Sequence, residues 1–239
     1  MIAYTNWADT YELFEGQTAT DIWRLGIAAE LGRLGTGVAT VLDLGAGTGI
    51  GSRVLGETAP GLTVTCLDRS AAMLDCGGVP SERRIVADMA DFSVPPGSFD
   101  FVVSGFDALN YLPPEPLANC LACVAGGLRP GGHLVFDYRS RKVLAVDWGN
   151  LEYEHEKDGH RLHRRHSYEF LFERSRTVLS LYRGDELLWR ETHIQHVVDP
   201  FRLEEMARGN GLETLLVRNI DSTHFSPAHP THVYVMRKF

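Results

Sequence analysis

The stretch Val41-Leu42-Asp43-Leu44-Gly45-Ala46-Gly47-Thr48-Gly49 decides how this chain folds. An apolar run with the character of a strand ends there in glycines at every second position, and a helix is predicted over residues 50–57. Because glycine has no Cβ atom, these positions let the backbone turn sharply and approach a ligand closely. The stretch therefore predicts a strand, a cofactor-binding loop and a helix in that order.

The glycine spacing does not match the common dinucleotide-binding fingerprint. That motif reads G-x-G-x-x-G, and its last glycine lets helix and strand pack while the helix N-terminus faces a pyrophosphate. Here Ile50 stands where the third glycine would be needed, and Gly51 comes one residue late. The acid Asp43 before the loop, and further acids at later strand ends, favour a different kind of cofactor site.

Residues 43–49, D-L-G-A-G-T-G, resemble the first motif of class I S-adenosylmethionine-dependent methyltransferases. The resemblance extends over most of the chain, from about Tyr4 to the last predicted strand. It implies a Rossmann-like α/β fold with a seven-stranded, mostly parallel sheet whose last strand is antiparallel. It also implies S-adenosylmethionine as cofactor, S-adenosylhomocysteine as product, and an acceptor that is a small molecule such as a natural product or amino sugar.

Composition sets limits on the class of protein. At 239 residues the chain can form one sizeable core but not two full α/β domains. The net charge of −8 disfavours a broad electrostatic grip on nucleic acid, although a small RNA-binding patch stays open. No apolar run is long enough for a membrane helix and residues 1–6 lack a signal-peptide pattern, so we expect a cytoplasmic protein without a membrane partner.

Cysteine and histidine patterns do not predict a metal site. Cys120 and Cys123 form a C-x-x-C pair on a predicted helix with no second pair nearby, which favours core packing over metal or redox work. Six of the ten histidines lie between His155 and His196, with runs spaced three apart. On a strand that spacing puts neighbours on opposite faces, so we expect no bound metal.

Two acids close the next predicted strands. Asp68 ends residues 62–67, where a carboxylate can accept both hydrogen bonds of a ribose diol, and the alternative is a solvated loop acid. Asp88 ends residues 84–87, and the resemblance puts the adenine amine on Asp88 and the adenine ring against Met89. The alternative for Asp88 is an acid at a helix N-terminus. Ser70 is expected to cap the helix that carries Met73.

The N-terminal segment carries four aromatic residues before any strand. Tyr4, Ala8 and Tyr11 fit the family's Y-x-x-x-A-x-x-Y pattern, with Glu12 in place of its acid, so the segment resembles a helix that closes over the cofactor. The alternative is an amphipathic helix packed on the sheet. A separate helix is predicted over residues 21–34, ended by Gly35 and Gly37.

The predicted fourth strand, residues 99–104, leads into a segment where the family places the transferred methyl. Asn110 and Tyr111 of this segment can present an amide and a phenol to an acceptor, although Tyr111 could instead only pack a helix. A helix over residues 116–128 and a turn over 129–132 precede the fifth strand, 133–137. Asp137, Tyr138 and Arg139 leave that strand at the edge where open α/β folds collect ligands.

Residues 141–199 change character and are predicted as an antiparallel β insertion that caps the acceptor site. Alternating segments at 151–156, 162–172, 177–182 and 187–197 are separated by turns at 158–159 and 184–185. Residues 1–140 and 200–239 then form the methyltransferase core, completed by a helix over 201–208 and strands over 212–219 and 232–237. Arg161, Arg164, Arg165, Arg174 and Arg176 of the insertion either hold an acidic acceptor or form solvated strand faces.

Methyl transfer from a sulfonium needs little more than positioning, and a base only for a protonated or weak nucleophile. Tyr111 and His193 are the predicted catalytic residues, with a surface role as the alternative for His193.

The predicted cofactor-binding residues are Tyr4, Tyr11, Asp43, Gly45, Ala46, Gly47, Gly49, Asp68, Arg69, Met73, Asp88, Met89 and Ser104. The predicted substrate-binding residues are Phe106, Asn110, Asp137, Tyr138 and Arg139. A tRNA or protein methyltransferase, a cofactor-binding protein without methyl transfer, and a homodimer all stay open.

Overall fold

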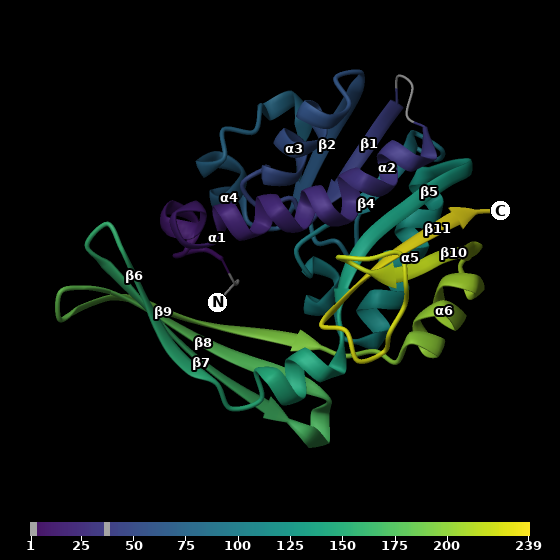
Figure 1. Ribbon diagram of the computed structural model, residues 1–239. Coiled ribbons are helices and arrows are strands. Elements are labelled where there is room, and N and C mark those ends of the chain that lie inside the picture. Colours follow the sequence, from purple (N-terminus) through teal and green to yellow (C-terminus); the bar gives the residue numbers. More distant parts are fainter. Residues whose placement is uncertain (1–3, 36–38) are drawn as a thin grey trace.

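A seven-stranded sheet forms the centre of the protein (Figure 1), in a computed structural model that describes residues 4–35 and 39–239. The strand order is β10-β11-β5-β4-β1-β2-β3. All neighbouring strands are parallel except that β11 is antiparallel to β5 and to β10. The strands are β1 (Ala39–Leu44), β2 (Leu62–Asp68), β3 (Arg84–Val86), β4 (Phe99–Ser104), β5 (Leu128–Arg139), β10 (Leu212–Asn219) and β11 (Thr231–Lys238). The predicted fold class, including the antiparallel last strand, is confirmed.

Helices cover both faces of this sheet because its strands carry apolar side chains on both faces. Val41 of β1 packs in one cluster with α1, α3 and α4, whereas Leu42 and Leu44 pack in another cluster with α5 and α6. The helices are α1 (Ala8–Trp23), α2 (Ala29–Leu34), α3 (Ile50–Thr58), α4 (Ala71–Cys76), α5 (Pro114–Gly127) and α6 (Pro200–Gly209). Among the described residues, no helix is both long and apolar enough to cross a membrane.

The two helices predicted for the N-terminal region are continuous. The sequence suggested a helix near Tyr4–Tyr11 and a separate helix from residue 21, but α1 begins at Ala8 and continues through a π-helical segment, Arg24–Ala28, into α2. Buried residues follow one another along α1 at helical spacing, which keeps a single helix packed on the sheet. Gly35, with φ of 73°, ends α2 as predicted, whereas Gly37 and residues 1–3 lie outside the described residues.

A second, four-stranded antiparallel sheet lies below α1 in Figure 1. It contains β6 (Glu152–Lys157), β7 (His160–Glu169), β8 (Arg174–Arg183) and β9 (Glu186–His196), in that order. The predicted hairpins are confirmed, but residues 170–172 form a 3₁₀ turn and not the end of a strand. Leu162, Leu179 and Leu181 of this sheet share a buried cluster with Trp7 and Tyr11, so the sheet packs against α1 and the segment before it. We call it the cap sheet.

The predicted turn at residues 129–132 is a bulge inside β5. Phe99 of β4 pairs with Leu128, but Phe101 pairs with His133, so the intervening residues of β5 loop out of register. β5 is therefore longer than the predicted strand, and it continues to Arg139 at the ligand-collecting edge of the sheet.

Candidate functional site

The end of β2 holds the glycine loop between β1 and α3. Gly45 and Gly47 have φ of 69° and 57°, a left-handed conformation that favours glycine. The amides of Gly45 and Ala46 donate to the Leu67 carbonyl at 2.8 and 3.0 Å. The Gly47 amide donates to Asp68 Oδ2 at 2.8 Å. The loop and Asp68 are thus fixed relative to one another.

A cavity of about 870 Å³, counting its open mouth, lies beside this loop. We call it the loop cavity. Ten residues that the sequence predicted for cofactor binding line it together: Tyr4, Tyr11, Gly45, Ala46, Gly47, Asp68, Arg69, Met73, Asp88 and Met89. Trp23 of α1 also lines it, and the sequence had not singled out this residue.

Two carboxylates lie at the rim of the loop cavity. Asp68 Oδ1 also accepts a hydrogen bond from the Ser70 amide at 2.8 Å. Burial raises the pKa of Asp68, and the hydrogen bonds from the Ser70 and Gly47 amides offset part of that rise. Asp88 Oδ1 accepts from the Ala90 amide at 2.9 Å. Both side chains therefore present hydrogen-bond acceptors beside an otherwise largely apolar slot.

Three other residues predicted for cofactor binding do not line this cavity. Asp43 is fully buried, and burial together with the charge of Asp68 raises its pKa well above the ordinary value. Ser104 Oγ donates to the Leu44 carbonyl at 2.9 Å, which ties β4 to β1. Gly49 has φ of 73° and starts α3. In the structure these three residues support the glycine loop. A direct contact between any of them and the cofactor stays a prediction.

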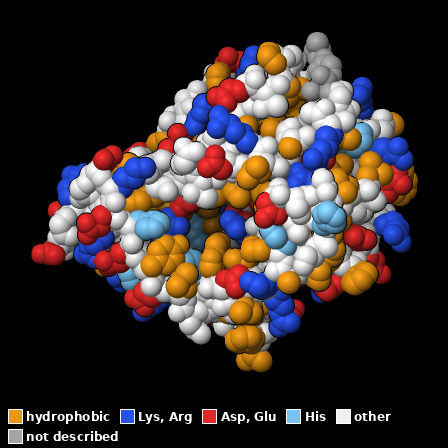
Figure 2. Space-filling view, viewed as in Figure 1, with side chains coloured by type: hydrophobic (Ala, Val, Ile, Leu, Met, Phe, Trp, Pro, Cys, Tyr) orange, Lys and Arg blue, Asp and Glu red, His pale blue; other side chains and the backbone are white. Residues whose placement is uncertain are grey.

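A second cavity, of about 900 Å³ with its open mouth, lies between the loop cavity and the cap sheet. We call it the cap cavity. Figure 2 shows this face hollowed near its centre, with basic and histidine side chains visible in the hollow. Tyr4, Tyr11, Phe106 and Tyr111 line both cavities and so form a shared wall.

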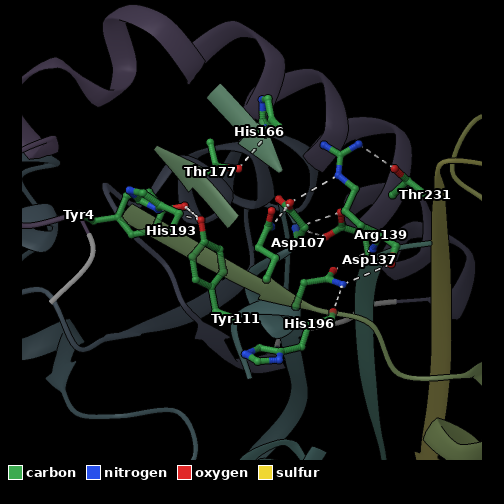
Figure 3. Close-up of polar contacts among 12 residues, drawn as sticks. Tyr4, Asp107, Tyr111, Asp137, Arg139, His166, Thr177, His193, His196 and Thr231 are labelled. Carbon is green, nitrogen blue, oxygen red and sulfur yellow. Dashed lines mark hydrogen bonds and ion pairs between the residues drawn. The ribbon is translucent and has the colours of Figure 1, made fainter. Parts of the chain in front are cut away.

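The two predicted catalytic residues meet at this wall (Figure 3). The Tyr111 hydroxyl lies 3.0 Å from His193 Nδ1 and 2.7 Å from the Tyr4 hydroxyl. His193 is buried on β9, and not at the surface as its alternative assumed. Burial, and then the charge of Asp107, raise the pKa of Tyr111, so its phenol is protonated at neutral pH.

The exit of β4 is held in an unusual conformation. Phe106 and Asp107 have φ of 57° and 54°, which non-glycine residues rarely adopt. The Asp107 amide donates to both oxygens of Asp137 at 3.2 Å, and Asp107 Oδ2 accepts from Gln195 Nε2 at 2.6 Å and lies 3.5 Å from Arg139 Nε. Burial raises the pKa of Asp107, and burial with the Asp107 charge raises the pKa of Asp137 to about 7. These contacts aim Asp107 and Arg139 into the cap cavity.

Residues from α1 and the cap sheet line the far part of the cap cavity. Arg164 forms an ion pair with Glu15, and its guanidinium lies 5.8 Å from the Tyr153 ring centre. His166 Nδ1 lies 2.8 Å from Thr177 Oγ1. Burial, and then the charge of Arg164, lower the pKa of His166 to about 4, so this imidazole is neutral at neutral pH. Of these residues the sequence had indicated only Arg164, as an open candidate.

Three residues predicted for substrate binding line neither cavity. The Asn110 amide group donates to the carbonyls of Arg139 and His196 at 3.2 and 3.0 Å. The Tyr138 hydroxyl donates to the His196 carbonyl at 3.2 Å, on the opposite face of β5 from Asp137. Asp137 lies behind Asp107 and is fully buried. Their side chains join β5, β9 and the β4 exit, whereas Phe106 and Arg139 of the predicted set do line the cap cavity.

Comparisons with known proteins agree with this geometry. Residues 41–132 match a family described as a methyltransferase domain. CcbJ methyltransferase from Streptomyces caelestis has a similar structure, with a TM-score of 0.82 and 20% identity over 98% of each chain. Residues 41–132 therefore match a methyltransferase domain, and the chain as a whole has the fold of known methyltransferases.

Two further similar proteins are informative. The trans-aconitate 2-methyltransferase of Deinococcus radiodurans is 36% identical over 48% of this chain and 46% of its own. The chain spans about half the length of the curated relatives it matches. CalS10, an amino pentose methyltransferase from Micromonospora echinaspora, has a TM-score of 0.66 and 18% identity over 99% of this chain and 95% of its own.

The loop cavity fits an adenosyl cofactor. A Cβ atom on Gly45 would lie 2.8 Å from Ala108 Cβ, so the loop needs glycine there to run close beside the cavity. Carboxylates at the ends of β2 and β3 suit a ribose diol and an amino group, which donate hydrogen bonds. The thioethers of Met73 and Met89 suit an apolar ring face.

Proposed function

We propose that this protein transfers the methyl group of S-adenosylmethionine to a nitrogen or oxygen of a small molecule in the cytoplasm. The shared wall of Tyr4, Tyr11, Phe106 and Tyr111 supports this proposal, because these side chains line both cavities and so bring them together. A cofactor in the loop cavity and an acceptor in the cap cavity would be held at attack distance there.

The proposed cofactor contacts follow from residue chemistry. Asp68 accepts from the ribose hydroxyls, Asp88 accepts from the adenine amine, and Met89 covers the ring. The glycine loop brings its backbone close to the rest of the molecule. When bound, S-adenosylmethionine supplies an activated methyl group on a sulfonium, so the protein needs only to orient the acceptor and handle its proton.

The charges of the cap cavity favour an acceptor without negative charge, one that carries hydroxyl groups and an amine. Arg164 is already paired with Glu15, and Arg139 lies beside Asp107, so neither cation is free for a polyanion. A tricarboxylate such as trans-aconitate would bring further negative charge close to the carboxylates of Glu15 and Asp107. An amine would instead be attracted to the carboxylate of Asp107. Aromatic ring faces such as that of Tyr153 suit a sugar ring. We therefore propose an amino sugar or similar natural product, the class on which CalS10 acts.

Tyr111 and His193 would receive the acceptor's proton. The Tyr111 hydroxyl lies within hydrogen-bond distance of His193 Nδ1 on one side and of Tyr4 on the other. A proton leaving the acceptor at the shared wall can therefore pass to His193 through Tyr111. An acceptor that is already a free amine needs only the positioning.

The test measures S-adenosylhomocysteine formed by the purified protein with S-adenosylmethionine and a panel of amino sugars, amino alcohols and phenols, beside tRNA and peptides. Calorimetry with S-adenosylhomocysteine measures cofactor binding separately. Turnover with an amino sugar or related small molecule is expected. Turnover only with tRNA or peptide would refute the acceptor class, and tight binding without any transfer would favour a protein that binds the cofactor without using it.

A further inference from the structure

Glu191 of β9 receives hydrogen bonds from the segment before α1, almost the whole length of the chain away. The Tyr4 amide donates to Glu191 Oε2 at 2.9 Å, and the Asn6 amide donates to Oε1 at 2.6 Å. The Glu191 side chain is 4% exposed, so these charge-assisted hydrogen bonds are shielded from water. One carboxylate therefore fixes this N-terminal segment to the cap sheet.

The same carboxylate lies beside the other ring nitrogen of His193. Glu191 Oε2 is 3.3 Å from His193 Nε2. Burial alone would raise the pKa of Glu191, but the interactions with His193, Asn6 and Tyr4 outweigh burial and hold the pKa below its ordinary value. An ionised carboxylate can only accept, so it favours the proton on Nε2. Nδ1 then carries a lone pair, which accepts from the Tyr111 hydroxyl 3.0 Å away.

The two roles meet at Tyr4. Its amide is held by Glu191, its hydroxyl lies 2.7 Å from that of Tyr111, and its ring centre lies 4.7 Å from that of His193. When Tyr4 is in place, the Tyr111 hydroxyl has a partner on each side. Closing the segment and completing the hydrogen-bonded chain are therefore coupled through one side chain.

We propose that Glu191 is a positioning residue that holds the N-terminal segment over the shared wall and sets the tautomer of His193. Nothing in the sequence pattern indicated this residue. The catalytic consequence rests on the proposed function, whereas the tautomer and the closed segment do not depend on any acceptor.

The test compares the wild-type protein with Glu191→Gln, and uses Glu186→Gln at the exposed start of β9 as the matched control. Nitrogen NMR of protein labelled in histidine reports which ring nitrogen carries the proton. Hydrogen exchange reports the protection of the Tyr4 and Asn6 amides. In wild type and Glu186→Gln, His193 is expected as the Nε2–H tautomer with both amides protected.

Glu191→Gln places an amide of the same size at this position, so it offers one acceptor where the carboxylate offered two. The Nδ1–H tautomer is expected to increase, and amide protection and S-adenosylhomocysteine affinity are each expected to fall about tenfold or more. With a working acceptor, kcat is expected to fall more than KM rises, because the lost orientation acts on the reacting groups. Thermal unfolding of both variants checks that each is folded.

An unchanged imidazole pattern in folded Glu191→Gln would overturn the tautomer role, and unchanged amide protection would overturn the closing role. If no acceptor is ever methylated, the proposed function fails, but the NMR and exchange measurements still decide the role of Glu191. The failure of one proposal is therefore distinguishable from the failure of the other.

Discussion

The carboxylate of Asp68 receives two backbone hydrogen bonds, from Gly47 and Ser70, and still faces the loop cavity. A carboxylate has about four acceptor sites, so two remain for a ligand that donates. The side chain thus shapes the glycine loop and also offers the acceptors that a ribose diol needs. Replacing it acts on both roles.

We expect Asp68→Ala to weaken S-adenosylhomocysteine binding by about 1–3 kcal/mol, because the diol and the Gly47 amide both lose their acceptor. Asp68→Asn keeps one acceptor oxygen and should lose less. Calorimetry measures both. Asp185→Asn, in the exposed hairpin between β8 and β9, serves as the control and should bind as wild type. Wild-type affinity in folded Asp68→Ala would remove Asp68 from the proposed cofactor site.

Tyr111→Phe tests the shared wall by removing a single oxygen atom, that of the Tyr111 hydroxyl. The ring remains to separate the cavities, but the link between Tyr4 and His193 is lost. Turnover should fall by about 10- to 100-fold, within the usual range for a group that assists proton transfer, while S-adenosylhomocysteine affinity changes little. Tyr182→Phe is the control, since Tyr182 stacks with Arg161 outside both cavities. Equal turnover in Tyr111→Phe would leave Tyr111 with packing alone.

Strand-end acids and the glycine loop were predictable because each follows its own strand in the sequence. Asp107 was not predicted as a site residue, because its position in the cap cavity depends on a left-handed backbone held by contacts with Asp137, Gln195 and Arg139 from other strands. Glu191, Gln195 and His166 were not predicted as site residues. Gln195 and His166 line the cap cavity, and Glu191 contacts the segment before α1, because the cap sheet folds back onto α1. A local pattern of alternation cannot show which face of a strand will meet that helix.

At the scale of elements, hydrophobic alternation and turn residues predicted the strands well. β4 has the bounds expected from the sequence, and the hairpins of the cap sheet start where Gly159 and Gly184 indicated. Helix boundaries were less certain because the signals inside 8–34 are weak: no glycine or proline lies in residues 17–25, so nothing in the sequence marks whether a helix ends or begins near residue 21. Tertiary packing along one continuous buried face decided the length of that helix.

The packing of α1 on α3 gives a prediction with a control on the same helix. A Cβ atom on Gly51 would lie 2.3 Å from the Trp23 indole, whereas a Cβ on Gly56 would meet nothing within 4 Å. Gly51→Ala should therefore lower the free energy of unfolding by about 1–3 kcal/mol and weaken S-adenosylhomocysteine binding, since Trp23 lines the loop cavity. Gly56→Ala should be neutral or stabilise α3 by up to about 1 kcal/mol. Urea unfolding measures both, and equal effects would contradict this account of the α1–α3 contact.

At the scale of the whole molecule, the two sheets meet where the parallel strands end. The β4 and β5 ends supply Asp107, Asp137 and Arg139 (Figure 3). β9 contributes Gln195, whose Nε2 donates to Asp107 Oδ2 at 2.6 Å. Asp107 and Asp137 are buried side by side at this junction, and burial raises the pKa of both carboxyl groups. Such placement has a cost that depends on pH.

The pH-dependent cost of burying a carboxyl group can be measured at Asp137. Its pKa is raised to about 7 by burial and by Asp107, against about 3.9 in an unfolded chain. Between these values the folded protein binds a proton that the unfolded chain has released. The free energy of unfolding should therefore be highest near pH 4 for this group and fall as pH rises to about 7, by up to about 1.4 kcal/mol per pH unit.

Asp137→Asn removes the titrating group while its carbonyl can still accept from the Asp107 amide. Urea unfolding at pH 5, 6, 7 and 8 should show the decline in wild type and in the exposed control Asp185→Asn, and a flatter profile in Asp137→Asn. The variant should also be more stable than wild type at pH 8, because no charge is buried at that position. A wild-type slope in Asp137→Asn would mean that the ionisation at this junction belongs to Asp107, whose pKa burial also raises.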